Sequence, residues 1–131
     1  MTPDASIVIP VFNNAELTRA CLERVIETTE GLSVQIVVVD NASTDETSEM
    51  LASFGDAVEV ISNDENVGFT IASNQGAAVA TGRYVVFLNN DTLPEPEWLD
   101  WLIRTAERDE TVGAVGSKLV YPDGALQEPA A

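Results

Sequence analysis

The sequence predicts an α/β fold with a mostly parallel sheet and helices on both of its faces. Short apolar runs rich in Val, Ile and Phe alternate with segments of helical periodicity, which is typical of parallel strands joined by crossover helices. Several of these runs also end in polar residues, at Asn13, at Asp40-Asn41 and at Asn89-Asn90-Asp91. Because the carboxyl ends of parallel strands meet at one edge of a sheet, the pattern predicts a ligand site at that edge.

The first predicted strand and helix lie within residues 6–29. The run SIVIPVF at residues 6–12 is apolar on both faces, as expected for a buried strand, although Pro10 argues against full pairing near its end. Either Asn13 or Asn14 is expected to cap the helix that follows. The apolar stripe of this helix is predicted to contain Leu17, Cys21 and Val25.

A second strand and helix are predicted next, followed by a short third strand. The second strand is VQIVVV at residues 34–39. Ser43, with Glu46 three residues later, has the sequence signature of a capping box at the start of a helix. This helix is expected to stop at Gly55, before a strand at residues 58–61.

The strand that carries the third polar tip is YVVFL at residues 84–88, and Asn89 to Asp91 follow it directly. The helix before it, at residues 66–82, has many small residues, Gly76 among them, which favour a close approach of the helix to the sheet or to a ligand. A further helix is expected at residues 94–108, with prolines in its first turn. The last predicted elements are a strand at residues 112–120 and a turn at residues 121–124.

A chain of 131 residues is expected to form one domain with a single core. Its one cysteine, Cys21, excludes an internal disulfide and is predicted to be a small buried side chain. The sequence shows no basic, apolar leader and no apolar segment long enough to span a bilayer. We therefore expect a cytoplasmic domain, either free or peripheral at the cytoplasmic face of the membrane, and a membrane-associated parent protein stays open.

The chain is strongly acidic, with 22 Asp and Glu residues, 6 Lys and Arg residues and a formal net charge of −16. Nucleic acid is not an expected partner, since phosphate backbones are bound mainly by Lys and Arg. The acidic residues are spread along the sequence, which is typical of a solvated surface. A salt-rich native cytoplasm is a further hypothesis, because salt screens self-repulsion; a stability that does not fall as salt is removed would contradict it.

The polar strand ends suit a nucleoside diphosphate. Asp40 can accept the N–H of a pyrimidine base, and the main chain from Pro10 to Asn13 can flank the base and ribose. A diphosphate would face Asp91, and two like charges about 4 Å apart repel by roughly 4 kcal/mol at an effective dielectric of about 20. Arg83 is the one basic residue near these motifs in the sequence. We therefore predict a divalent cation, Mg²⁺ or Mn²⁺, between Asp91 and the phosphates, where it would also stabilise the departing diphosphate.

The order of the motifs resembles that of one enzyme family. SIVIPVFNN, VVVDNASTDET, NVGFTIASNQG and YVVFLNND together look like the inverting family 2 glycosyltransferases, and the resemblance covers nearly the whole chain. It implies the Rossmann-like GT-A fold and transfer of a sugar from a UDP- or dTDP-sugar to a glycan, lipid-linked or other hydroxyl acceptor, as in polysaccharide biosynthesis. The segments NVGF…NQG and LNNDT most resemble those of rhamnosyl- and galactofuranosyltransferases.

The resemblance also implies roles for individual residues. Asp91 would be the metal ligand, because residues 89–91 stand where the family has its Asp-x-Asp motif, and Asn89 would lie near the ribose or sugar. The residues of the nucleoside pocket would be Pro10, Val11, Phe12, Asn13 and Asp40. Those bordering the rest of the nucleotide would be Asn66, Gly68, Asn74, Asn89 and Asn90.

Two features depart from the family pattern. Asn89 stands in place of the first Asp of the metal motif, which removes one charge. An inverting transfer also needs a catalytic base, and neither late carboxylate, Asp123 or Glu128, is assigned to that role, so the catalytic residue is unknown. We interpret residues 1–131 as the nucleotide-binding half of a larger enzyme, an N-terminal nucleotide-sugar-binding domain whose C-terminal part, with the acceptor contacts and the base, is missing.

Alternatives to a glycosyltransferase stay open. The same pocket can belong to a module that binds a nucleotide-sugar but has no turnover on its own. A receiver- or flavodoxin-like signalling domain is also acidic and doubly wound. A receiver, however, would have acidic residues where Asn13-Asn14 stand and a lysine at the end of its last strand, whereas Lys118 lies inside the predicted strand.

Overall fold

A computed structural model describes residues 2–108, 119–120 and 126–127 of the chain. The chain divides into two compact units, Met1–Leu93 and Pro94–Ala131, which we describe separately. The first unit contains a parallel sheet with the strand order β3-β2-β1-β4. Its elements are β1 Ala5–Val11, α1 Ala15–Thr28, β2 Val34–Asp40, α2 Thr47–Ala52, the 3-10 turn η1 Gly55–Ala57, β3 Glu59–Ser62, α3 Phe69–Val79 and β4 Tyr84–Phe87.

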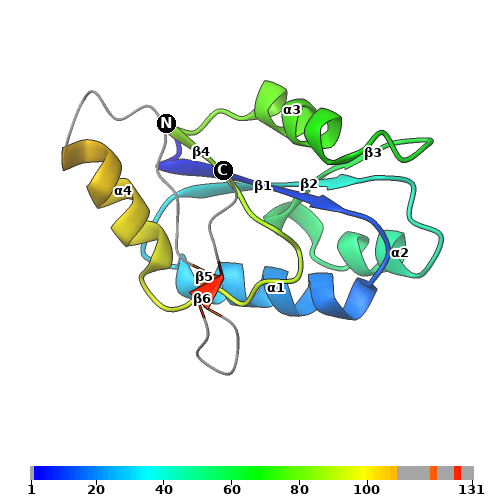
Figure 1. The fold of residues 1–131 in the computed structure, drawn as a ribbon, viewed down its shortest axis with the longest axis horizontal. Helices are drawn as coiled ribbons and strands as arrows, with labels where there is room; N and C mark the ends of the chain where they lie inside the picture. Colours follow the sequence, from blue (N-terminus) through cyan, green and yellow to red (C-terminus); the bar gives the residue numbers. More distant parts are fainter. Residues whose placement is uncertain (1, 109–118, 121–125, 128–131) are drawn as a thin grey trace. The chain divides into compact units, whose positions relative to one another are not determined.

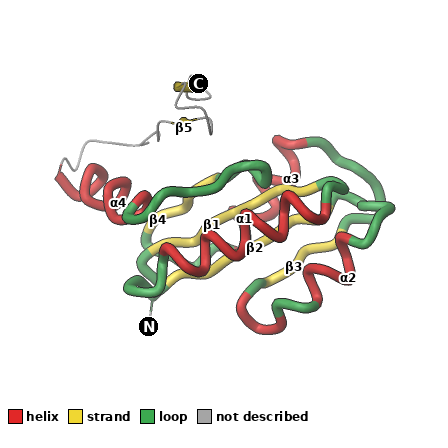
Figure 2. Tube along the Cα trace, turned by 90° about the horizontal axis from the view of Figure 1, so that it is seen from below, coloured by secondary structure: helices red, strands yellow, loops and turns green. Residues whose placement is uncertain are grey.

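Helices cover both faces of this sheet. In Figure 1, α1 and α2 lie on one face and α3 on the other, and Figure 2 shows α1 running along the strands. The strand order explains this arrangement. The chain winds outward from β1 to β3 and then returns past β1 to β4. Since such crossovers are right-handed, the returning helix α3 must lie on the opposite face. The predicted α/β fold is therefore confirmed.

The core is built around β1, in which every residue is buried. On the face covered by α3, Val8, Val37, Val39 and Ala72 form a cluster without solvent exposure. Gly76 of α3 lies directly against Val8, and a Cβ atom at this position would clash with the Val8 side chain. At Gly76 the small residue therefore serves a close approach of the helix to the sheet, which is one of the two roles that the sequence suggested.

Pro10 lies in the middle of the sheet, where a missing N–H would normally be costly. β1 pairs with β2 along its whole length, with Pro10 opposite Val39. Its pairing with β4 ends at Val8, whose carbonyl accepts the N–H of Leu88 at 2.9 Å. Backbone groups of alternate residues point to the same neighbour, so Pro10 faces the β4 side beyond the end of that ladder. The expectation that Pro10 limits pairing therefore holds on the β4 side only.

The capping box predicted at Ser43 and Glu46 is wrong. Helix α2 begins at Thr47, and Glu46 at its N-cap position makes no side-chain capping hydrogen bond. The hydroxyl of Ser43 instead accepts the N–H of Asn13 at 2.8 Å. A partner 30 residues away has thus replaced the local partner that the sequence pattern indicated. Before α1 the cap position falls on Asn14, as predicted, but this residue caps through its backbone conformation alone.

The apolar stripe predicted for α1 is also partly wrong. Leu17 is 51% exposed, whereas Thr18 is completely buried. The face that α1 buries consists of Ala15, Thr18, Cys21, Leu22 and Val25. Thr18 thus occupies the core-facing position of α1 that the hydrophobic pattern predicted for Leu17.

The second unit contains α4 Trp98–Arg108 and an antiparallel pair of short strands, β5 Leu119–Val120 and β6 Leu126–Gln127. The helix begins later than predicted, because Glu97 has a φ of 66°, a left-handed conformation that cannot continue into a helix. Most of the predicted strand at residues 112–120 and the turn at residues 121–124 lie outside the described residues. Within the described residues, no helix has the length and apolar character needed to cross a membrane.

Candidate functional site

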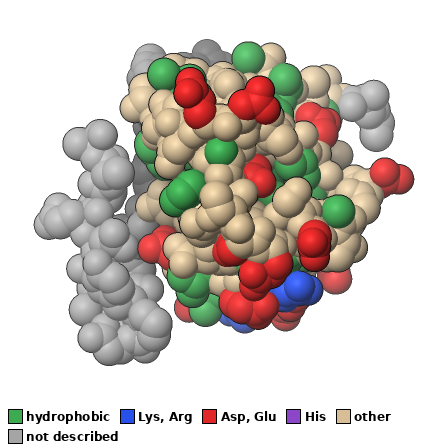
Figure 3. Space-filling model, turned by 90° about the vertical axis from the view of Figure 1, so that its right-hand side faces the viewer, with side chains coloured by type: hydrophobic (Ala, Val, Ile, Leu, Met, Phe, Trp, Pro, Cys, Tyr) green, Lys and Arg blue, Asp and Glu red, His purple; other side chains and the backbone are tan. Residues whose placement is uncertain are grey.

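The ends of β1, β2 and β4 bring the predicted site residues to one edge of the first unit, which we call the carboxyl edge. Val11 and Asp40 are opposite each other in the sheet, and the N–H of Asn41 donates to the Val11 carbonyl at 2.9 Å. Because β4 is parallel to them, Asn89 to Asp91 follow it at the same edge. Strands β1 and β2 point to the right in Figure 1, and Figure 3, viewed from that side, shows acidic side chains scattered over the face.

The loops after β1 and β2 are tied together by hydrogen bonds that we call the loop clasp. Asn13 Oδ1 accepts the N–H groups of Thr44 at 2.7 Å and of Asp45 at 3.3 Å. The N–H of Asn13 donates to Ser43 Oγ at 2.8 Å, and Asp45 Oδ2 accepts the N–H of Ala15 at 3.3 Å. The side-chain oxygen of Asn13, a predicted nucleotide-binding residue, is therefore engaged within the protein.

The clasp holds several residues in left-handed backbone conformations. Asn13 and Asn14 have φ values of 54° and 59°, which Asn tolerates better than most residues. Ala42 has a φ of 63°, and for a residue with a Cβ atom this region costs roughly 1–2 kcal/mol. Such strain persists only where surrounding contacts impose it, so the loop after β2 is held in a fixed shape.

Hydrogen bonds hold the pKa of Asp45 below its ordinary value of 3.8. The hydroxyl of Thr47 has the largest effect, and the N–H groups of Thr47, at 2.9 Å, and of Ala15 add to it. Partial desolvation of the carboxylate opposes them. The negative form of Asp45 is thus the one that completes the clasp.

Asp40 is only 5% exposed although it carries a carboxylate. Its Oδ1 atom accepts the N–H of Ser43 at 3.1 Å. Within the described residues, Ser43 supplies the hydrogen-bond donor found for this carboxylate. It occupies one of the two carboxylate oxygens. A buried carboxylate needs donors for its remaining lone pairs, and the ring N–H of a nucleobase can supply one.

An amide network holds the loop that precedes α3. Asn63 Nδ2 donates to Asn41 Oδ1 at 3.0 Å and to Gln75 Oε1 at 2.8 Å, and Gln75 Nε2 donates back to Asn63 Oδ1 at 3.0 Å. Asn41 Nδ2 donates to the carbonyl of Gly68 at 3.4 Å. The network thereby places the N-terminus of α3 beside the end of β2. The N–H groups of the first helical turn have no partners within the helix, which makes this end favourable for an anion.

The predicted residues before α3 and within it are open to solvent. Asn66, Gly68 and Asn74 are all exposed. Asn66 Oδ1 accepts the N–H of Gly68 at 2.9 Å, and Gly68 has a φ of 88°, which only glycine adopts readily. Two exposed aromatic residues share the carboxyl edge, Phe12 at 44% and Phe69 at 57% exposure.

Residues 89–92, which we call the tip loop, follow β4. Asn89 and Asp91 are exposed, while Asn90 between them is half-buried and donates from Nδ2 to Thr18 Oγ1 at 3.0 Å. The hydroxyl of Thr92 closes the loop by donating to the carbonyl of Asn89 at 2.7 Å. The tip loop thus presents Asn89 and Asp91 outward, whereas the side chain of Asn90 points toward α1.

Cys21 is completely buried below the tip loop, as predicted for a small core side chain. Its thiol donates to the carbonyl of Asn89 at 3.8 Å. Burial raises the pKa of the Cys21 thiol to about 11, and the negative charge of Asp91 contributes in the same direction. The thiol therefore stays protonated at neutral pH.

The donor set at the carboxyl edge fits a shared metal ion better than a resident one. Within the described residues no group of three or more His, Cys, Asp or Glu side chains is arranged to hold a metal. Asp91 offers one exposed carboxylate. Mg²⁺ in nucleotide sites typically uses one or two carboxylates, completed by phosphate oxygens and water. Arg83, at the amino end of β4, lies at the opposite edge and cannot take the place of such an ion.

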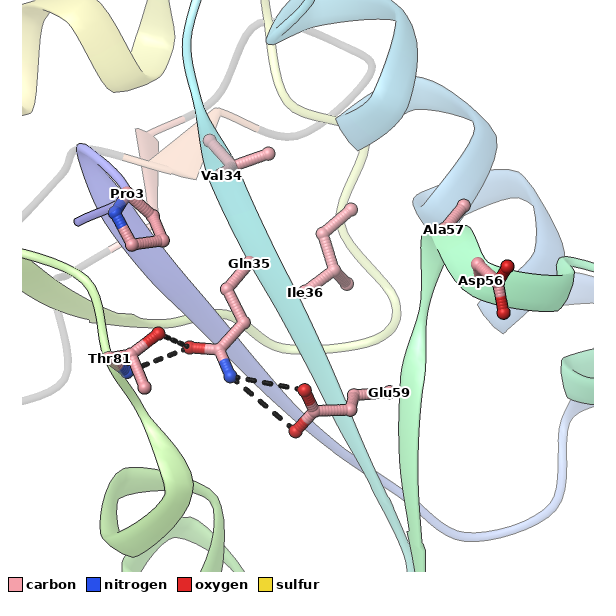
Figure 4. A pocket seen from close by; sticks show the side chains of 8 residues that line it. All are labelled: Pro3, Val34, Gln35, Ile36, Asp56, Ala57, Glu59 and Thr81. Carbon is pink, nitrogen blue, oxygen red and sulfur yellow. Dashed lines mark hydrogen bonds between the residues drawn. The ribbon is translucent and has the colours of Figure 1, made fainter. Parts of the chain in front are cut away.

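A separate hollow of about 280 Å³ lies at this opposite edge, which we call the amino edge (Figure 4). Gln35 spans it: its Oε1 accepts the N–H of Thr81 at 2.9 Å and the hydroxyl of Ser6 at 2.6 Å. Its Nε2 donates to Glu59 Oε1 at 3.3 Å and to the carbonyl of Val79 at 3.1 Å. Both polar atoms of Gln35 already have hydrogen-bond partners within the protein. We therefore assign the residues of this hollow a structural role.

The structure brings together most of the residues that the sequence singled out and adds several that it missed. Thr18 under the tip loop, Asn63 before α3 and Gln75 within α3 had no predicted role, and Cys21 was expected only as a core side chain. One sequence signal for such a role was Thr18, a polar residue on the face of α1 that also carries Cys21 and Val25. No local pattern distinguishes Asn63 and Gln75 from other surface amides. Asp123 and Glu128 lie outside the described residues.

Comparison with known proteins gives one consistent family. Residues 6–130 match the family described as Glycosyl transferase family 2. The chain is 35% identical over 129 residues to the O-antigen biosynthesis protein RfbC of Myxococcus xanthus, covering 96% of this chain and 10% of that protein. It is 34% identical over 128 residues to the glycosyltransferase AglE of Haloferax volcanii, covering 93% of this chain and 42% of that protein.

The fold resembles that of solved GT-A glycosyltransferases. The mannosyltransferase PcManGT from Pyrobaculum calidifontis, in complex with GDP-Man and Mn²⁺, superimposes with a TM-score of 0.75 at 26% identity, covering 94% of this chain and 37% of that one. The chain thus spans less than half the length of these relatives. The match leaves no support for a receiver- or flavodoxin-like domain. With a family match over nearly its entire length, the chain belongs to glycosyl transferase family 2 and has the GT-A fold.

Proposed function

We propose that this chain binds the nucleoside-diphosphate sugar in an inverting glycosyltransferase that transfers the sugar to a glycan, lipid-linked or other hydroxyl acceptor. The observation that supports this most is that Val11, Asp40 and Asp91 all come at or just after the ends of parallel strands. They combine a buried carboxylate suited to a base with an exposed carboxylate suited to a phosphate-bound cation. The motifs around Asn66 and Asp91 further favour a rhamnosyl- or galactofuranosyltransferase type.

In this proposal Asp40 accepts an N–H of the base, and the chain from Pro10 to Asn13 flanks the base and ribose. Uracil, thymine and guanine all offer a ring N–H, so this contact alone does not select among them. UDP- and dTDP-sugars are our preferred donors. GDP-mannose is the competing donor, because a relative of similar fold was solved with it.

The diphosphate would lie between the N-terminus of α3 and the tip loop. The unpaired N–H groups of the helix, with Asn66, Gly68 and Asn74 beside them, would bind its anionic oxygens. A bound Mg²⁺ or Mn²⁺ would neutralise phosphate charge and stabilise the leaving diphosphate. Asp91 would hold this cation, and Asn89 would lie near the ribose or sugar. Asn90 would contribute through the position of its backbone, since its side chain faces α1.

The acceptor and the catalytic base would be supplied by a further part of the enzyme. The chain covers 37–42% of the length of two of its relatives, so a donor-binding domain joined to an acceptor domain is the arrangement we propose. A module that binds the donor without turnover on its own is the second candidate. Two observations support this second candidate: the chain contains no histidine, and none of the described residues is assigned as the catalytic base. A cytoplasmic location, either free or peripheral to the membrane, stays a prediction.

Calorimetry with UDP, dTDP and GDP, each with and without Mn²⁺, tests the proposal. We expect one nucleotide to bind much more tightly with Mn²⁺, and Asp91→Asn to abolish that difference. Asp56→Asn is the matched control, because it removes the same charge at the amino edge. Absence of nucleotide binding to the wild-type protein, or equal Mn²⁺ dependence in Asp91→Asn, would refute the proposal. Release of free sugar or transfer to an added acceptor would separate the enzyme from the binding module.

A further inference from the structure

Helix α1 carries two polar side chains below the tip loop, within an otherwise largely apolar buried face. Thr18 and Cys21 are both completely buried. Thr18 Oγ1 accepts the side-chain N–H of Asn90 across 72 residues of sequence, at 3.0 Å. The thiol of Cys21 donates to the carbonyl of Asn89 at 3.8 Å, which is a weak contact. Figure 1 shows the segment after β4 passing over α1. The tip loop is therefore fastened to the helix from below.

The direction of Asn90 determines what the loop presents to solvent. Asn90 is half-buried, while its neighbours Asn89 and Asp91 are exposed. The hydrogen bond to Thr18 fixes Asn90 on the protein side of the turn, so the backbone on either side of Asn90 is fixed as well. The internal bond between Thr92 and Asn89 keeps the loop short, so the loop has little freedom to compensate if this anchor is lost.

We propose that Thr18 is a positioning residue for Asp91: its hydroxyl holds Asn90 inward and thereby keeps the Asp91 carboxylate directed at the carboxyl edge. This inference rests on the proposed function in one respect, namely that Asp91 binds a cation. Among the described residues Asp91 is the one carboxylate assigned to the cation, so binding depends strongly on how the tip loop is held. If the loop were not already ordered, the cost of ordering it would be paid at the moment of binding.

The replacement Thr18→Val tests this role, because it keeps the β-branched shape and removes only the acceptor. Asn90 then loses its partner, and the tip loop gains access to other conformations. One lost hydrogen bond corresponds to a weakening of the Mn²⁺–nucleotide affinity by about threefold to tenfold. Thr18→Ser keeps the hydroxyl and should restore most of the affinity.

Thr29→Val is the matched control, at the C-cap of the same helix. Thr29 is 3% exposed and donates its hydroxyl to the carbonyl of Val25 at 2.7 Å. It lies 11 residues beyond Thr18, about 16 Å along the helix axis. Its loss should lower the melting temperature as much as Thr18→Val does, but leave the Mn²⁺ affinity unchanged. If Thr18 had only a structural role, Thr18→Val would also lower the melting temperature and leave the Mn²⁺ affinity unchanged.

Two measurements decide the outcome. The first is NMR of the metal-free protein, in which the Asn90 side-chain amide should be shifted and protected in the wild type and Thr18→Ser, and released in Thr18→Val. The second is Mn²⁺ binding, followed by electron paramagnetic resonance with UDP and, separately, with GDP. An Asn90 amide equally protected in Thr18→Val, or an Mn²⁺ affinity equal to that of Thr29→Val, would overturn the inference.

The two proposals can fail separately. If the wild-type protein binds Mn²⁺ with neither UDP nor GDP, the cation site of the proposed function is refuted. The NMR measurement still decides whether Thr18 orders the tip loop. If the wild type binds Mn²⁺ and Thr18→Val binds it equally well, the proposed function stands and the positioning role is refuted.

Discussion

At the amino edge of the sheet, the polar atoms of Gln35 are engaged by Ser6, Thr81, Glu59 and Val79. At the carboxyl edge, Asp91, Asn66 and Asn74 stand exposed on loops and helix turns held by other polar residues. The same kinds of side chain are used, but their hydrogen bonds are directed differently. A polar group without a partner in a buried setting costs about 1–3 kcal/mol. Polar side chains at an edge therefore either bond to one another, which adds stability, or stay exposed, where they can bind a ligand. Those of the carboxyl edge named above stay exposed.

The carboxyl edge also separates holding residues from presented residues. Asn13, Asn63 and Gln75 direct their side chains to other parts of the protein and fix the loops. Asn90 does the same for the tip loop, which presents Asp91 to solvent. This division predicts that substitutions at the two edges have different consequences even when the chemical change is the same.

The largest effect on stability is expected for Gln35→Leu. It leaves the completely buried hydroxyl of Ser6 and the N–H of Thr81 without their acceptor. The free energy of unfolding should fall by about 2 kcal/mol, which corresponds to about 8 °C in melting temperature. Calorimetry should show unchanged nucleotide affinity, because the residue lies at the amino edge.

Gln75→Leu is the corresponding change at the carboxyl edge. It breaks the amide network with Asn63 that holds the start of α3, so nucleotide affinity should fall together with stability. If Gln35→Leu weakened nucleotide binding, or if Gln75→Leu left it intact, the contrast between the two edges would be wrong.

The next effect is expected for Asp40→Asn. The amide keeps an oxygen for the N–H of Ser43 but turns a donor group toward the base. Nucleotide affinity should fall by about tenfold, or about 1.4 kcal/mol. Glu59→Gln makes the same chemical change on β3 at the amino edge and should leave the affinity unaltered. Equal affinities for the two variants would show that Asp40 does not contact the base.

Acid should loosen the loop clasp through Asp45. Its pKa in the folded protein lies below 3.8, so the carboxylate contributes stability above that pH and loses it as the pH falls through the lowered value. Melting curves from about pH 6 to about pH 3 should therefore show a smaller acid loss for Asp45→Asn than for the wild type. Thr47→Val removes the strongest hydrogen bond and should reduce the acid loss in part. An unchanged pH profile in both variants would contradict this role.

The smallest effect is expected for Ala42→Gly. Glycine relieves the left-handed strain of roughly 1–2 kcal/mol but loses more entropy on folding, so the net gain should be at most about 1 kcal/mol. Ala20→Gly, at an exposed position inside α1, should instead destabilise by about 1 kcal/mol. Opposite signs in thermal melts would support the strained loop, and equal losses would disprove it.

Much of this architecture could be predicted from the sequence. The apolar runs at residues 6–12, 34–39 and 84–88 correspond to β1, β2 and β4, and their polar ends meet at one edge as predicted. Burial on both faces and the alternation with helices are local properties of the chain, so a few residues at a time suffice to indicate them. The positions of Asp40 and Asp91 at strand ends follow from the same pattern.

Tertiary packing decided which polar side chains face inward. Asn13, Thr18 and Asn90 have partners 30 to 72 residues away, so no local pattern could show that these side chains are engaged. The same cause explains the failed capping box at Ser43 and the exposure of Leu17. The sequence by itself determined strands, helices and the edge at which we propose that the nucleotide binds. The assembled sheet determined which of the edge residues are held and which are presented, because hydrogen bonds between distant segments form only after the segments have packed.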